Sequence, residues 1–281
     1  MRTLRWLAFN FAWGLWTALF GLAIPLLWSI GSPARIVRIL SRLWARGVLA
    51  MLSVIVGLKH VERGREHVPS SPSLIVSNHE STWETLAALV LFPGVAIIAK
   101  RELLRIPVMG WYLRRSPMIV IDRDSASKAL RKMADESRAA LAEGRSVLIF
   151  PEGKRRRAGE ALEFKRGVEL LYRTLDVPVL PVVLNSGNFW GTGGRPKRPG
   201  SIVVSFLAPI YPGLSAAAFV TTATVRMTAE KMALDREGGD LPDAGRRESD
   251  PRTSVEPGRP AAGTEATPQA VPPVSSRDGR L

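Results

Sequence analysis

No charged residue occurs between positions 6 and 30, and four tryptophans lie inside this run. About 20 consecutive apolar residues are enough to cross a lipid bilayer as a helix. The run therefore predicts a membrane-associated helical segment, which either crosses the bilayer or forms a hairpin broken near Gly21 and Pro25. It is too long for the apolar part of a signal peptide and lacks a small-residue cleavage site. The alternative is a buried helix pair in a soluble protein.

Arginines flank this run on both sides. Arg2 and Arg5 precede it, and the more numerous ones that follow are Arg35, Arg38, Arg42 and Arg46. The heavier positive flank predicts that the part that follows lies on the cytoplasmic side of a bacterial-type inner membrane. Between positions 36 and 58 the arginines alternate with apolar residues, which predicts a helix lying on anionic lipid. Residues 1–58 are therefore expected to form a membrane-anchoring segment.

A catalytic body is expected from residue 59 to residue 233. Short apolar runs predict strands at 74–76, 95–98, 118–121, 147–150, 179–184 and 202–206. Helical patterns fall between them, at 82–91, 125–143 and 164–175. Strands that alternate with helices predict an α/β fold, with a mixed, largely parallel central sheet flanked by helices.

The formal net charge is +14. The first 234 residues carry the whole excess, because positions 235–281 hold seven arginines against nine acidic residues. A basic body of this kind indicates an anionic partner: nucleic acid, an anionic membrane or a phosphorylated substrate. Residues 234–281 are rich in Pro, Gly and charged residues, which predicts a disordered tail.

Cysteine is absent, so disulfides, thiolate nucleophiles and cysteine-held metals are excluded. The three histidines are scattered without acidic residues at ligand spacing, so no metal site is expected.

His79 lies between an apolar strand and a helix. In parallel α/β sheets, ligands gather at this end of a strand. Glu84 follows five residues later, and on one regular helix the two side chains would point in different directions. They can meet if His79 lies in the turn and Glu84 in the first helical turn. The carboxylate would then bind one ring nitrogen and leave the other free as a base. On spacing alone, a histidine after a strand is more often structural.

The stretch Asn78-His79-x-Ser81-x-x-Glu84 resembles the first motif of the glycerolipid acyltransferases, which include 1-acyl-sn-glycerol-3-phosphate acyltransferase. That motif is usually written His-x4-Asp, so this chain has Glu84 where Asp is usual. Glutamate keeps the charge but is one methylene longer. The resemblance implies that His79 is the catalytic base and that Glu84 is its partner.

Further blocks resemble the same family in the same order. Residues 150–155, Phe-Pro-Glu-Gly-Lys-Arg, are similar to its Phe-Pro-Glu-Gly-Thr-Arg block, with Lys154 where Thr is usual. The resemblance implies a phosphate-binding group that comprises Glu152, Gly153, Lys154 and Arg155. Taken alone, the basic run 154–157 also fits a solvated loop.

Two more blocks are similar to the family's phosphate-binding segments. Ile121-Asp122-Arg123 implies that Arg123 is a phosphate ligand, and the segment 100–103 adds Lys100 to the candidates. The apolar block at 177–182 is similar to a structural wall of the family.

The implied reaction moves a fatty acyl group to the sn-2 hydroxyl of lysophosphatidic acid and gives phosphatidic acid. Acyl-CoA or acyl carrier protein is the co-substrate, and no cofactor is expected. The expected partners are thus the lysophospholipid, the acyl thioester and membrane lipid. Backbone amides near residues 78–81 are expected to stabilise the oxyanion, and no acyl-enzyme is expected.

The sequence also allows other functions. The acceptor can be another lipid, such as a lyso-ornithine lipid or glycerol 3-phosphate, and water as acceptor would make the chain a thioester hydrolase. A non-enzymatic basic protein that binds a membrane surface or nucleic acid would explain the charge. However, the chain has no helix-turn-helix and no aromatic-basic RNA block, so nucleic acid is not an expected partner.

Overall fold

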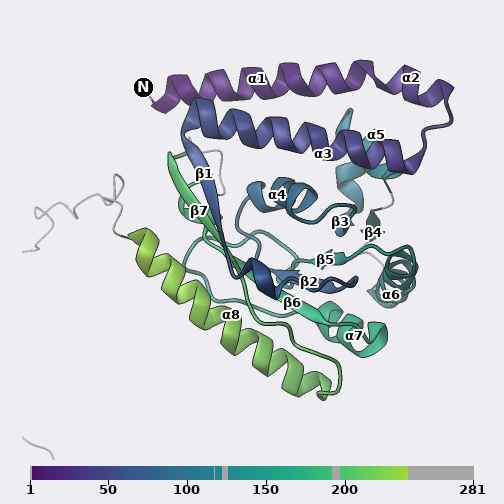
Figure 1. Ribbon diagram of the computed structural model, residues 1–281, viewed down its shortest axis with the longest axis vertical. Helices are drawn as coiled ribbons and strands as arrows, with labels where there is room; N and C mark the ends of the chain where they lie inside the picture. The colour runs from purple at the N-terminus through teal and green to yellow at the C-terminus, as the bar shows by residue number, and fades with distance from the viewer. Residues whose placement is uncertain (1, 117, 122–125, 192–196, 240–281) are drawn as a thin grey trace, which may run out of the picture. The chain divides into compact units, whose positions relative to one another are not determined.

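Figure 1 shows a computed structural model of the chain, which describes residues 2–116, 118–121, 126–191 and 197–239. These residues fall within one unit that spans Met1–Leu241. Arg123, predicted to bind phosphate, lies outside the described residues, as does most of the predicted tail, from residue 240 onward.

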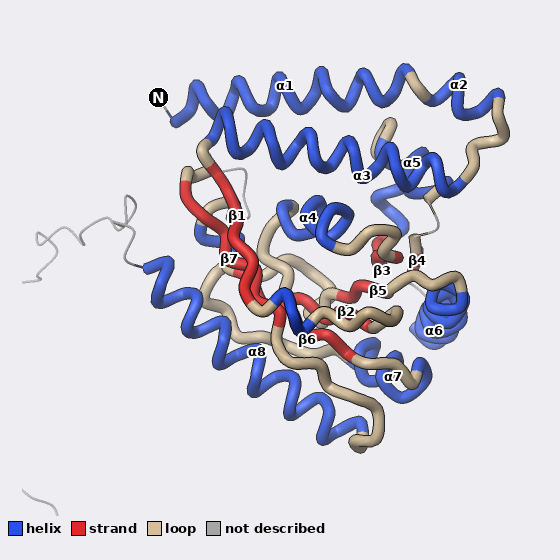
Figure 2. Tube along the Cα trace, viewed as in Figure 1, coloured by secondary structure: helices blue, strands red, loops and turns tan. Residues whose placement is uncertain are grey.

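The described residues form a seven-stranded sheet with the order β1-β7-β6-β2-β5-β3-β4 (Figure 2). The strands are β1 (Leu58–Arg63), β2 (Leu74–Ser77), β3 (Ala96–Lys100), β4 (Ile119–Ile121), β5 (Val147–Ile149), β6 (Val179–Leu184) and β7 (Gly200–Phe206). From β6 to β4 all neighbours pair in parallel. At the other edge β7 runs antiparallel to β6, and β1 runs parallel to β7. The predicted mixed, largely parallel sheet is confirmed.

Helices cover both faces of the sheet, which explains why the central strands are apolar on both sides. In β2, Ile75 packs on the face covered by α4 (Trp83–Leu91), while Leu74 and Val76 pack on the opposite face. That opposite face is covered by α6 (Ala126–Ala142), α7 (Arg166–Leu175) and α8 (Ala216–Gly239). The core is therefore two apolar layers, one on each side of the sheet.

The elements that were not predicted from the sequence include β1 and α8. The strand β1 buries only Leu58, and its other residues are polar apart from the exposed Val61, so it has no apolar run that would mark it. The helix α8 continues past the expected domain end at residue 233 and reaches Gly239. Its Leu234 is fully buried, so the chain up to this helix belongs to the packed body.

The N-terminal segment forms an antiparallel pair of long helices above α4 (Figure 1). They are α1 (Arg2–Leu22), continued after Ala23 by α2 (Ile24–Ser29), and α3 (Ala34–Met51), continued by a π-helical turn at Leu52–Val56. The chain reverses at Gly31 and Ser32, which both have positive φ, and not at Gly21 and Pro25. Proline is tolerated in the first turn of a helix, so Pro25 starts α2 without turning the chain back.

Tryptophans hold the two long helices together. The indole N–H of Trp16 donates to the carbonyl of Trp44 at 3.0 Å, and that of Trp44 donates to the hydroxyl of Thr17 at 3.1 Å. Gly47 lets Trp16 approach, because a Cβ there would lie 2.5 Å from the indole ring. The remaining short helices are α5 (Met109–Arg115) and the 3-10 turns at Arg65–His67, Arg101–Arg105 and Ser186–Asn188.

Candidate active site at the carboxyl ends of β2, β5 and β6

Three neighbouring parallel strands end beside one another, and each is followed by residues of the candidate site. His79 follows β2, Phe150 and Glu152 follow β5, and Ser186 follows β6. The Asn78 side chain ties two of these ends together: its amide group exchanges hydrogen bonds with the backbone of Leu184 at 2.8 and 2.9 Å. The predicted gathering of motifs at one sheet edge is therefore present.

The ring of His79 contacts the carboxylate of Glu84, with 2.8 Å between Nδ1 and Oε1. His79 lies in the turn after β2, and Glu84 lies in the first turn of α4. The turn bends the chain enough for two side chains five residues apart to meet, as required by the sequence argument. The extra methylene of Glu84 does not prevent the contact.

Hydrogen-bond donors contact both oxygens of the Glu84 carboxylate. Its Oε1 also accepts the backbone N–H groups of Glu80 and Ser81, each at 2.6 Å. Its Oε2 accepts the hydroxyls of Ser81 at 2.6 Å and Ser186 at 2.8 Å. Burial alone would raise the pKa of Glu84, but the bonds from His79 and Ser81 outweigh burial and lower its pKa. The group is therefore an ionised acceptor.

An ionised acceptor at Nδ1 determines the state of the imidazole. Nδ1 must carry a proton to donate to Glu84, so in the neutral ring the lone pair lies on Nε2. The ring is also held from the side, because it stacks on Phe150 with 4.1 Å between centroids and 16° between planes. The His79 side chain keeps 18% of its surface exposed. Nε2 is thus prepared to accept a proton from a molecule that enters from solvent.

Glu152 lies beneath the His79 turn. It is fully buried, and its Oε1 accepts the backbone N–H of His79 at 3.3 Å. Its Oε2 has no hydrogen-bond partner among the described residues. Burial raises the pKa of Glu152 to about 8, and the nearby Glu84 and Glu80 carboxylates act in the same direction. This side chain supports the turn from below and does not face solvent.

The backbone amides of the turn are already occupied. Those of Glu80 and Ser81 donate to Glu84, and that of His79 donates to Glu152. The expectation that an oxyanion is stabilised here therefore conflicts with the structure for the amides of residues 79–81, because buried carboxylates accept their hydrogen bonds.

Exposed basic residues follow β5 and end β3, at the same edge of the sheet. The guanidinium of Arg155 donates to the hydroxyl of Thr82 at 3.3 Å, which places it beside the start of α4. Lys154 is exposed on the same loop, and Gly153 has a φ of +66° that favours glycine. Lys100 is exposed at the carboxyl end of β3, one strand beyond β5. Of the predicted phosphate-binding residues, Glu152 thus contacts the backbone of His79, and Arg155 is the basic residue with a contact at the start of α4.

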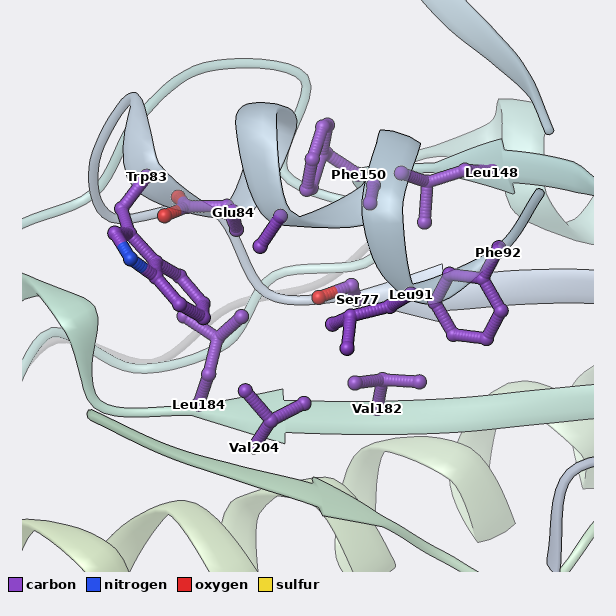
Figure 3. Close-up of a pocket in the computed structure, with 12 residues that line it drawn as sticks. Ser77, Trp83, Glu84, Leu91, Phe92, Leu148, Phe150, Val182, Leu184 and Val204 are labelled. Carbon is purple, nitrogen blue, oxygen red and sulfur yellow. The ribbon is translucent and has the colours of Figure 1, made fainter. Parts of the chain in front are cut away.

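A small apolar cavity lies between α4 and the sheet, with Glu84 at its margin (Figure 3). Its volume of about 10 Å³ is close to the space needed by one water molecule. Its lining is apolar apart from Ser77 and Glu84 and comprises Trp83, Ala87, Ala88, Leu91, Phe92, Leu148, Phe150, Val182, Leu184 and Val204. In the part of the chain that the structure describes, no cluster of His, Asp or Glu has the arrangement of a metal site.

Several residues of the site were missed from the sequence. Ser186 and Asn185 directly follow β6, so their place at the carboxyl end of an apolar strand was a usable signal. Phe150 lies within a recognised block, but stacking on His79 depends on the packing of two strands. Lys231 of α8 contacts Glu80 in the turn, and nothing in the sequence places these two residues together.

Known proteins resemble this chain in sequence and in fold. The Acyltransferase family profile matches residues 60–185. A 1-acyl-sn-glycerol-3-phosphate acyltransferase from Pseudomonas aeruginosa is 38% identical over 161 residues, which cover 57% of this chain and 63% of that protein. The match therefore spans just under two thirds of the Pseudomonas protein.

A second relative is covered more fully. The 1-acyl-sn-glycerol-3-phosphate acyltransferase alpha of Homo sapiens is 33% identical over 207 residues, 73% of this chain and 71% of that protein. Among solved structures, the 1-acyl-sn-glycerophosphate acyltransferase PlsC from Thermotoga maritima matches with a TM-score of 0.59 and 24% identity. The match covers 84% of this chain and 98% of that one, and it supports the fold described above.

Proposed function

This chain belongs to the acyltransferase family that includes the 1-acyl-sn-glycerol-3-phosphate acyltransferases, and we propose that it acylates the sn-2 hydroxyl of lysophosphatidic acid. The observation that carries the proposal is the His79–Glu84 contact of 2.8 Å, on a sheet edge that also bears exposed basic residues. A histidine base suits an alcohol acceptor, and the basic residues suit its phosphate. The product is phosphatidic acid.

His79 acts as the general base in this proposal. Nε2 takes the proton of the sn-2 hydroxyl while that oxygen bonds to the thioester carbonyl carbon. The carbon–sulfur bond then breaks, and the departing thiolate takes the proton from the imidazolium. Glu84 stabilises the imidazolium between these steps. A placed base of this kind is worth about 10²–10⁴-fold in rate.

Basic side chains hold the phosphate of the acceptor. We assign this role to Arg155 and Lys154, assisted by the Gly153 turn, by Lys100 and by Arg123. A guanidinium offers paired donors to phosphate oxygens, and an ammonium adds charge. Glu152 receives a different role: as a buried carboxyl beneath the His79 turn, it supports the base and does not bind phosphate.

The N-terminal helices support a location of this site at a membrane. Both Arg2–Ser29 and Ala34–Val56 are long and apolar enough to cross one. Along α1 and α2, large apolar side chains recur on one exposed face: Leu4, Leu7, Phe11, Leu15, Leu19, Leu22 and Leu26. The opposite side of α1 packs on α3, so lipid is the occupant that suits the exposed face. The flanking arginines favour the cytoplasmic side of a bacterial-type inner membrane.

Substrate identity is tested with membranes that contain the full chain. Labelled acyl-CoA or acyl carrier protein is offered with lysophosphatidic acid, glycerol 3-phosphate or a lyso-ornithine lipid. The proposal predicts labelled phosphatidic acid that is absent from membranes lacking the chain, with lysophosphatidic acid as the best acceptor. Hydrolysis of the thioester without transfer, or preference for an acceptor without phosphate, would contradict it.

A further inference from the structure

Helix α8 carries a lysine inside its buried face. The buried positions Phe219, Ala223 and Met227 recur every four residues, as expected for one side of a helix. The next position of this series is Lys231, which is 4% exposed. A buried ammonium is unfavourable unless it is paired, so its partners show why a charge occupies an apolar stripe.

Lys231 pairs with the turn that carries His79. Its Nζ lies 2.8 Å from Oε1 of Glu80, a residue that is 2% exposed. The same ammonium contacts Asp235 one turn further along α8. Glu80 follows His79 directly in the chain, so α8 reaches the turn from the sheet face opposite α4.

Glu80 also contacts the second loop of the site, which follows β6. Its Oε2 accepts the backbone N–H of Gly187 at 2.9 Å. A Cβ at Gly187 would lie 2.9 Å from that oxygen, so the glycine gives the carboxylate room. The neighbouring Ser186 donates to Glu84, and the backbone N–H of Glu80 donates to Glu84 as well. Glu80 therefore joins both loops that hold the partner of His79.

We propose that Lys231 is a positioning residue for the His79–Glu84 pair and acts through Glu80, an inference that rests on the proposed acyl transfer. Burial raises the pKa of Glu80 to about 7, while the Lys231 charge acts in the opposite direction. Without this cation, the buried Glu80 carboxylate lacks its counter-ion and either takes up a proton or turns toward water. Each change loosens the turn between β2 and α4, although Lys231 touches no substrate.

The test compares Lys231→Met with Asp235→Asn in the full-length protein. The methionine keeps an unbranched apolar side chain, one atom shorter than lysine, and removes the charge, whereas Asp235→Asn removes the other anionic partner of the same ammonium. We expect kcat to fall about 10- to 100-fold in Lys231→Met, with KM for both substrates changed less than about threefold. In Asp235→Asn, kcat should stay within about twofold of wild type, because Glu80 keeps its cation.

A double-mutant cycle identifies the route of the effect. Glu80→Gln preserves an acceptor for Gly187 but removes the charge. If Lys231 acts through Glu80, the double variant Glu80→Gln/Lys231→Met should be no slower than the slower single variant. Wild-type kcat in Lys231→Met would overturn the proposal. An equal loss in Asp235→Asn would also do so, because it would locate the effect within α8. If Lys231→Met does not fold, wild-type kcat in Glu80→Gln overturns it.

Hydrogen exchange separates this inference from the choice of substrate. The amides of Glu80 and Ser81 donate to the Glu84 carboxylate, and the amide of Gly187 donates to that of Glu80. Peptides covering 78–84 and 185–190 should therefore exchange faster in Lys231→Met. This readout does not depend on the acceptor. If lysophosphatidic acid is not the acceptor, the proposed function fails, but faster exchange still supports the positioning role of Lys231. Unchanged exchange in these peptides would overturn the positioning role of Lys231.

Discussion

Ser186, just beyond β6, donates its hydroxyl to Glu84 at 2.8 Å, so the carboxylate that orients His79 is held from a second strand. The first motif is thus incomplete without a residue about one hundred positions later. His79 and Glu84 belong to one segment, the turn after β2 and the first turn of α4, so they can shift together. The bond from Ser186 attaches this segment to the end of β6.

Removing this anchor should weaken catalysis without abolishing it. In Ser186→Ala, the Ser81 hydroxyl and two backbone N–H groups still reach Glu84. We expect kcat to fall about three- to tenfold, which corresponds to the loss of one hydrogen bond worth about 1 kcal/mol. Steady-state kinetics measures this, with the exposed Ser201→Ala as control. An unchanged kcat would show that Ser186 is dispensable.

The charge and the reach of Glu84 are separable. Glu84→Gln removes the negative charge that stabilises the imidazolium, and we expect kcat to fall about 10²–10⁴-fold, the range for loss of acid–base assistance. Glu84→Asp keeps the charge but draws it back by one methylene. We expect a smaller loss of about tenfold, because the histidine is only slightly misplaced. If Glu84→Gln were faster than Glu84→Asp, the charge would not matter.

Glu152 should make stability depend on pH. Its folded pKa is about 8, against 4.5 for an unperturbed group, so the folded state binds this proton more tightly than the unfolded state. Stability therefore falls as pH rises from about 4.5 to about 8, by a few kcal/mol for this group. Melting temperatures between pH 5 and 8 should fall more steeply in wild type than in Glu152→Gln. Parallel curves would contradict this, and the exposed Glu66→Gln serves as control.

Arg155 should affect acceptor binding more than turnover. Its guanidinium lies beside Thr82 at the start of α4, and the proposal directs it to the acceptor phosphate. Loss of a charged hydrogen bond, worth about 1.5–3 kcal/mol, predicts that Arg155→Met raises KM for lysophosphatidic acid about 10- to 100-fold. The neighbouring Arg157→Met should change KM little. An equal rise in both variants would indicate a general charge effect.

The apolar face of α1 should be required for membrane association. Phe11 and Leu15 are 76% and 65% exposed, and a charged residue in the bilayer interior is unfavourable by about 2.5–3.5 kcal/mol. Phe11→Glu/Leu15→Glu should move protein from the membrane to the soluble fraction in vesicle flotation. Val225→Glu, on α8 with 62% exposure, is the matched control. If both variants float alike, α1 does not bind the lipid.

Elements whose structure is determined by a local sequence pattern are predictable from the sequence. The apolar runs that became β2, β5 and β6 are buried on both faces, so composition alone marks them. The His79–Glu84 contact was predictable because it needs only one turn between a strand and a helix. The polar edge strand β1 carried no such pattern, and its pairing with β7 is set by tertiary structure.

The remaining contacts of the site depend on long-range packing. Lys231 and Glu80 are far apart in the chain, and a lysine in a helix predicts a solvated side chain unless its partner is known. Glu152 was assigned to phosphate from its block, whereas its burial beneath His79 follows from how β2 and β5 lie side by side.

In the proposed mechanism, Nε2 of His79 takes the proton of the acceptor hydroxyl. The most direct measurement follows thiol release and phosphatidic acid formation together, in membranes carrying wild type or His79→Ala at equal protein levels. We expect one thiol released per phosphatidic acid formed in wild type, and both rates reduced by about 10²–10⁴-fold in His79→Ala. Phosphatidic acid formation at the wild-type rate in His79→Ala would contradict it.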